Sequence, residues 1–140
     1  MSRKLNEKFL NVFIEIDKHC CEKFGVASGG VTEYINRLNN ARFAHGRDEA
    51  LPRLVRYRNT RNRFAHEPSA LRKSDEISKD DLKWITKFKK ELFARRDPIS
   101  RYLRKARRYA RRRRLFKYAI SFLVLLLVVA VAVLCIALAH

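Results

Sequence analysis

Residues 2–24 read SRKLNEKFLNVFIEIDKHCCEKF, and this stretch decides what kind of fold the chain can adopt. Its apolar residues recur at intervals of three and four, with charged residues between them: Leu5, Phe9, Leu10, Val12, Phe13, Ile16 and Cys20. Such spacing places side chains on one face of an α-helix, which completes a turn in about 3.6 residues. The stretch therefore predicts an amphipathic helix with one buried face, and Gly25 is a natural end for it.

The residues that follow predict two more helices joined by short loops. After the loop ASGG at 27–30, a helix fits residues 32–43, with Thr32 as a possible N-cap. Its inward face is formed by Tyr34, Ile35 and Leu38. The next helix begins near Asp48, tolerates Pro52 in its first turn and runs to about Glu67, just before Pro68.

A fourth helix is predicted to open at Ser78 and to stop before Asp97 and Pro98. The Ser78 hydroxyl can cap this helix while Asp81, three residues on, reaches back to the cap. Its inward residues are Leu82, Ile85, Phe88, Leu92 and Phe93. No stretch alternates with period two for long enough to predict a strand, so residues 1–97 are expected to form a small antiparallel four-helix bundle in an all-α chain. Its core is modest, and association between copies would stabilise it.

The last quarter of the chain has a different character. Residues 118–139 read YAISFLVLLLVVAVAVLCIALA and carry no charge. A helix of about 22 residues spans roughly 33 Å, enough for a hydrocarbon core of about 30 Å, so we expect one C-terminal transmembrane helix. The segment 98–117 before it is expected to be a basic amphipathic helix, which either lies on the membrane surface or continues straight into the span.

Charge predicts how the chain sits on the membrane. Twelve Lys or Arg residues lie between Arg95 and Lys117, against the single acid Asp97. Basic flanks stay on the cytoplasmic side, so we expect a single-pass protein of the inner membrane with a cytoplasmic N-terminal domain. The residues expected to contact anionic lipid are Arg107, Arg108, Arg111, Arg112, Arg113 and Arg114. The basic stretch accounts for part of the formal net charge of +18, and the remaining residues are basic too, which favours an anionic partner such as RNA.

Metal and disulfide chemistry receive little support from the sequence. Cys20 and Cys21 are adjacent and Cys135 lies in the predicted span, so there is no disulfide framework. His19 precedes Cys20 and Cys21, but no second pair of ligands follows at a usual zinc spacing. We therefore expect neither a metal nor another cofactor.

One phrase occurs twice in the chain. Residues 42–46 read RFAHG and residues 63–67 read RFAHE, and only the second copy has an Arg five residues before its His, with an Asn after that Arg. Arg61, Asn62 and His66 form this second set. A guanidinium can hold phosphate oxygens, an imidazole can transfer a proton near neutral pH, and an amide can orient either group. The second copy is therefore the candidate site, whereas the first is expected to be a helix end with Phe43 buried.

The helix itself limits how these residues cooperate. Five residues turn a helix by about 500°, which leaves Arg61 about 140° from His66, while Asn59 and Asn62 lie near the His66 face. Arg61 and His66 can meet if the helix frays near Pro68, if Arg61 uses its reach, or if two copies meet across a two-fold axis. Arg58 and Arg63 are expected to contact RNA backbone or solvent.

The stretch resembles the signature of the HEPN superfamily, small all-α domains in which an Arg is followed by four to six variable residues and then a His. Arg61 and His66 fit the four-residue version, with Asn62 in the polar position that often follows the Arg. The resemblance covers residues 1–95 and implies a metal-independent endoribonuclease that acts as a homodimer or larger homo-oligomer. In it, His66 transfers protons, Arg61 stabilises the charge on phosphate and Asn62 orients them. It also implies a role as a toxin or in antiphage defence, with an antitoxin or a CRISPR effector as a possible partner.

Two other functions stay open. A non-catalytic oligomer whose spans perturb the membrane would be similar to HEPN-like accessory proteins of RNA-targeting CRISPR systems. The predicted span has neither a GxxxG motif nor an ionisable residue, which gives a pore weak support. A plain tethered adaptor for a protein or RNA is the third possibility.

Overall fold

The structure is a computed structural model that describes residues 2–67, 69 and 76–139. Within these ranges, the side chains of residues 2, 128, 130, 132–137 and 139 are outside the description. The described chain folds into helices: α1 (Ser2–Phe24), α2 (Gly30–Asn40), α3 (Arg47–His66), α5 (Lys79–Phe93) and α6 (Pro98–Ala139). No strand occurs among the described residues, which confirms the all-α prediction.

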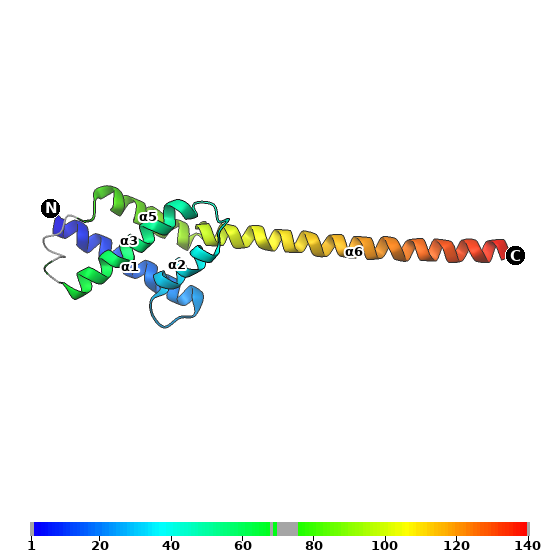
Figure 1. Cartoon of the computed structure of the whole chain (residues 1–140), viewed down its shortest axis with the longest axis horizontal. Coiled ribbons are helices and arrows are strands. Elements are labelled where there is room, and N and C mark those ends of the chain that lie inside the picture. Colours follow the sequence, from blue (N-terminus) through cyan, green and yellow to red (C-terminus); the bar gives the residue numbers. More distant parts are fainter. Residues whose placement is uncertain (1, 68, 70–75, 140) are drawn as a thin grey trace. The chain divides into compact units, whose positions relative to one another are not determined.

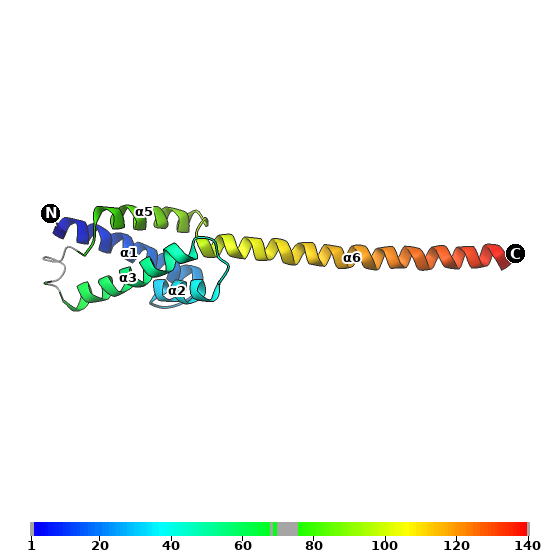
Figure 2. The same ribbon diagram turned by 45° about the horizontal axis from the view of Figure 1, so that its top comes forward.

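The first compact unit comprises residues 1–102 and is built around α1. Helix α1 packs against α2 and α5, and α2 packs against α3; Figure 1 and Figure 2 show α5 alongside α1. The predicted stripe of α1 supplies fully or nearly fully buried residues to the core: Phe9, Phe13, Ile16 and Cys20. Phe93, which the sequence predicted to face inward, is 47% exposed because it follows the fully buried Leu92 and therefore points about 100° away from it around the helix.

Helix α2 begins two residues earlier than the sequence predicted, and its N-cap is Gly29 rather than Thr32. The reason is a close crossing with α1, where a Cβ on Gly30 would lie 2.3 Å from the Asp17 carbonyl oxygen and 2.5 Å from the Cys21 nitrogen. The Val31 backbone N–H also donates to Asp17 Oδ1 at 2.8 Å. A carboxylate from another helix therefore satisfies one of the free donors at this helix start.

Helix α5 begins as the sequence predicted. The Asp81 N–H donates to the Ser78 hydroxyl at 3.1 Å, and the Ser78 N–H donates to Asp81 Oδ2 at 3.0 Å. These two bonds form a capping box, which is a local device that sequence spacing can reveal.

A buried carboxylate holds the first turn of α6 within this unit. Asp97 is fully buried, and its carboxylate accepts hydrogen bonds from the Tyr34 hydroxyl at 2.9 Å, the Lys23 ammonium at 3.3 Å and the Ser100 N–H at 3.2 Å. The pKa of Tyr34 is raised, first by burial and then by the neighbouring Asp97 charge. Asp97 thus caps α6 and ties its start to α1 and α2.

The second compact unit begins at residue 103, and its described residues 103–139 are the rest of the single long helix α6. The basic stretch therefore continues in helical form from residue 98 into the apolar segment, one of the two possibilities for 98–117. All six arginines expected to contact lipid are exposed. The predicted span at 118–139 falls partly outside the described side chains, and no helix among the described residues is long and apolar enough to cross a membrane.

Candidate functional site

The candidate site lies at the C-terminal end of α3. This helix follows Gly46, whose φ of 82° is one that glycine adopts most readily, and it carries acidic residues in its first turn. Pro52 lies inside the helix. The residues that anchor α3 are buried and recur at three and four: Ala50, Leu54, Tyr57, Thr60 and Phe64. The opposite face of the helix is therefore left to solvent.

Helix α3 stays intact through the residues proposed for catalysis. Its last helical residue is His66, and the Glu67 N–H donates to the Arg63 carbonyl at 2.7 Å. A helix that ends after His66 keeps Arg61 and His66 about 140° apart. Fraying before His66 therefore does not bring the two side chains together.

The three candidate residues are partly linked. His66 and Asn62 are exposed and lie about 40° apart around the helix, while Arg61 is half-buried on its flank. Arg61 Nη1 donates to Asn62 Oδ1 at 3.4 Å, at the long end of hydrogen-bond geometry. The guanidinium thus turns toward the amide beside His66, and no contact between Arg61 and His66 is found in the described part of the chain.

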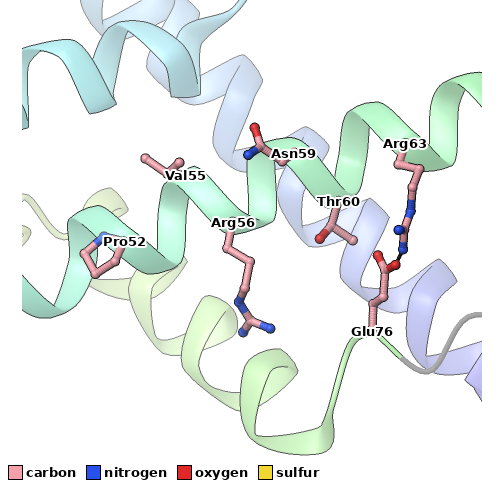
Figure 3. Close-up of a pocket in the computed structure, with 7 residues that line it drawn as sticks. All are labelled: Pro52, Val55, Arg56, Asn59, Thr60, Arg63 and Glu76. Carbon is pink, nitrogen blue, oxygen red and sulfur yellow. Dashed lines mark ion pairs between the residues drawn. The ribbon is translucent and has the colours of Figure 1, made fainter.

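The two arginines expected to contact RNA already have partners. Arg58 donates to Asn59 Oδ1 through Nε at 3.4 Å and through Nη2 at 3.2 Å. Arg63 forms an ion pair with Glu76, as Figure 3 shows. Any anion that binds Arg63 has to compete with this carboxylate.

An open groove of about 650 Å³ runs along α3 next to these residues. It is lined by Pro52, Val55, Arg56, Asn59, Thr60, Arg63 and Glu76, drawn in Figure 3. Arg56, Asn59 and Arg63 recur at three and four, so the sequence carried a signal for this face. Sequence reasoning placed Asn59 near the His66 face but gave it no role, and it missed Arg56 and Thr60 because it followed the Arg–His spacing. Glu76 could not be found this way because it comes from beyond the end of α3.

At one end of this groove, Arg56 binds a carboxylate on α5. Asp81 accepts hydrogen bonds from the Tyr57 hydroxyl at 2.9 Å and from Arg56. Burial raises the pKa of Asp81, but the hydrogen bonds from Ser78, Tyr57 and Arg56 outweigh it and hold the pKa below its ordinary value. Burial and the bond to Asp81 raise the pKa of Tyr57 to about 12. Tyr57 is therefore a neutral donor near pH 7, which suits a structural rather than a catalytic role.

The first copy of the repeated phrase has a different structure. Helix α2 ends at Asn40, so residues 42–46 form a turn between α2 and α3 and not a helix end. Phe43 is 90% exposed, whereas Ala41 and Ala44 are buried. The prediction that Phe43 is buried was wrong, because the turn places the small alanines against the core and the ring outside.

His19, Cys20 and Cys21 do not face a common point. The His19 ring stacks on Phe93 with 4.3 Å between ring centroids, and Cys20 is fully buried. Burial raises the pKa of Cys20 to about 12, so its thiol stays protonated. In the described part of the chain, no group of three or more His, Cys, Asp or Glu side chains is placed to hold a metal ion.

Comparison with known protein families identifies a family for most of the chain. A family described as "Family of unknown function (DUF6548)" matches residues 7–119, which include all of α2, α3 and α5. No curated protein and no solved structure matches the chain.

Proposed function

The chain belongs to this family of unknown function, and on that premise we propose that it is a membrane-anchored, metal-independent endoribonuclease of the HEPN type. The observation that carries the proposal is the turn of the Arg61 guanidinium toward Asn62, which lies beside the exposed His66 at the end of α3. This arrangement supports the proposal because it links a phosphate-binding group to an orienting amide that lies beside an exposed proton-transfer group.

The reaction needs no metal in this proposal. One imidazole removes the proton of a ribose 2′-hydroxyl, and the 2′-oxygen attacks the adjacent phosphorus. The bond from phosphorus to the 5′-oxygen breaks, and the 5′-oxygen takes a proton from an imidazolium or from water. The products are a cyclic phosphate and a free 5′-hydroxyl. Arg61 stabilises the additional negative charge on phosphate, which a guanidinium does by two parallel hydrogen bonds.

Two copies of the chain complete the site. Arg61 and His66 diverge by about 140° on α3, so a single phosphate is reached more easily by Arg61 of one copy and His66 of another. In the described part of the chain, the face of α3 opposite its buried residues is exposed to solvent, so it can form such a contact with a second copy. An antitoxin or a CRISPR effector is the kind of partner that would restrain such a nuclease.

The C-terminal segment supplies the anchor in this proposal. Residues 118–139 carry no charge, and the basic residues before them favour a cytoplasmic bundle at the inner membrane. A reporter fused to the N-terminus should be protected in intact cells. A reporter that is accessible from outside would contradict this topology, and the bundle would then have no access to cytoplasmic RNA.

The nuclease is tested with the full chain in detergent, end-labelled RNA and an excess of chelator. We expect cleavage that survives the chelator and leaves cyclic phosphate ends. Total RNA integrity and membrane potential are measured together after induction in cells. Intact RNA with a collapsed membrane potential would contradict the nuclease.

That opposite outcome defines the second candidate, a non-catalytic oligomer that acts on the membrane. It is favoured by the long helix α6, in which exposed arginines lead directly into an uncharged segment. In this case toxicity survives His66→Ala and disappears when residues 118–140 are deleted.

A further inference from the structure

A second groove, of about 430 Å³, lies between α1 and α5 and belongs to the first compact unit. It is lined by Leu5, Lys79, Leu82, Lys83, Thr86, Lys87 and Lys90. The four lysines lie within an arc of about 80° on α5, so the groove has a cationic rim along one helix face. Leu5 and Leu82 are partly buried against the core and form its apolar floor.

The charge of this groove is largely uncompensated. Among the described residues no acidic side chain lines it, and Lys87 approaches Glu91 only at the limit of an ion pair, 4.0 Å. For Lys79, Lys83 and Lys90, the described residues provide no ion pair. The groove on α3 is different, because Asp81 and Glu76 neutralise its two arginines. The α5 groove is therefore the stronger candidate for an anion that has to be held by charge.

The residue types favour a lipid surface over a nucleic acid. Single-stranded nucleic acid is usually held by aromatic rings that stack on bases and by arginines, and neither occurs among the described residues that line the α5 groove. Lysines with long apolar stems can instead hold their ammonium groups at the level of lipid headgroups while their stems cover apolar surface. The leucines between them offer apolar contact at the same level.

We infer that the groove between α1 and α5 is a contact site for the headgroups of an anionic bilayer, separate from the C-terminal segment. At such a surface each basic residue raises membrane partition by about fivefold, so four lysines make a substantial contact. The bundle itself would then lie on the membrane by this face. The inference does not depend on nuclease activity, since none of the groove residues belongs to the α3 site.

The test measures the reactivity of individual lysines in the full chain. The chain is reconstituted into vesicles of phosphatidylcholine alone or of phosphatidylcholine with phosphatidylglycerol, and amines are acylated with a water-soluble ester and quantified by mass spectrometry. Lys18 is the internal reference, because it is exposed on α1 and lies about 140° around that helix from Leu5. We expect the rates at Lys79, Lys83 and Lys90, relative to Lys18, to fall several-fold only with the anionic lipid.

Variants and competing anions show whether the anionic lipid itself protects these lysines. The double variant Lys83→Glu with Lys90→Glu should lose the protection of Lys79. The control Lys18→Glu should keep it; in that variant the Lys79 rate is compared directly between the two kinds of vesicle. Helicity is checked for each variant by circular dichroism. Equal relative rates on both vesicles would overturn the inference. Protection by inorganic phosphate, RNA or polyglutamate, but not by anionic vesicles, would also overturn it and would assign the groove to a free anion, a nucleic acid or an acidic protein.

Discussion

The two copies of Arg-Phe-Ala-His form different structures although their sequences are identical over four residues. At 63–66 the phrase is the last turn of α3, with Phe64 4% exposed and His66 facing solvent. At 42–45 it forms a turn in which Phe43 is 90% exposed. The difference arises because α3 is anchored by four buried residues before Phe64, while α2 has already ended at Asn40. Local sequence therefore does not decide the conformation of such a short phrase.

The largest expected contrast between the copies concerns stability. Phe64→Ala removes a buried aromatic ring and should lower the free energy of unfolding by about 3–5 kcal/mol. Phe43→Ala removes an exposed ring and should change it by less than about 0.5 kcal/mol. Urea denaturation of both variants, followed by circular dichroism, measures the contrast. Similar losses for the two variants would show that residues 42–46 pack against another part of the protein.

The next contrast concerns activity. His66→Ala should slow RNA cleavage by at least about a hundredfold, as expected for a group that transfers protons. His45→Ala is the matched control and should leave the rate unchanged, because no Arg–Asn pair precedes it at the same spacing.

Arg61→Lys is measured in the same experiment and should also lose RNA cleavage. The ammonium group of a lysine is a point charge and cannot replace the bidentate hydrogen bonds of a guanidinium to phosphate. Rates are measured with end-labelled RNA in the presence of chelator. Full activity in His66→Ala would remove the second copy from the proposed site.

Acid should destabilise α3, the helix that carries the second copy, because its stability depends in part on the charged carboxylate of Asp81. The pKa of Asp81 is below its ordinary value of 3.8, so its contribution to stability is present above that pH and is lost as the pH falls through the lower folded value. Asp81→Asn weakens the bonds from Arg56 and Tyr57 and should cost about 1.5–3 kcal/mol at neutral pH.

Amide hydrogen exchange from pH 6 down to about pH 3, corrected for the intrinsic exchange rates, measures this loss of stability in α3. We expect protection at the C-terminal half of α3 to fall at low pH, and Asp81→Asn to lower it already at pH 6. Protection of α3 that is identical in the two proteins would contradict the role of Asp81.

The smallest expected effect concerns Arg63, the first residue of the second copy. Glu76→Gln removes the carboxylate paired with Arg63 and should raise RNA affinity by up to about fivefold, the range of a partly exposed ion pair. Glu22→Gln makes the same change of charge at an exposed position on α1 that does not line the α3 groove.

Fluorescence anisotropy with labelled RNA in a His66→Ala background measures the affinity without cleavage. Equal gains in Glu76→Gln and Glu22→Gln would show that only net charge matters and that Arg63 has no particular role.

The chain fold was predictable where the signals are local. The stripe of α1, the Ser78–Asp81 capping box and the helical character of α1, α2, α3 and α5 follow from residue spacing. The start of α2 was not predictable, because Gly30 is required by contact with α1 and the free N–H of Val31 is satisfied by Asp17, 14 residues earlier. Such contacts depend on how two helices cross, which spacing within one helix does not encode.

The candidate site, like the fold, was predictable from the sequence only in part. The sequence by itself determined that α3 is a helix and that Arg61 and His66 diverge on it, since the angle follows from five residues of helical rotation. Only the tertiary structure decided that Phe64 is buried while Phe43 is exposed, and that Glu76 and Asp81 neutralise Arg63 and Arg56. Burial and ion pairing between distant segments depend on the packing of helices against one another, so they emerge only when the whole bundle is assembled.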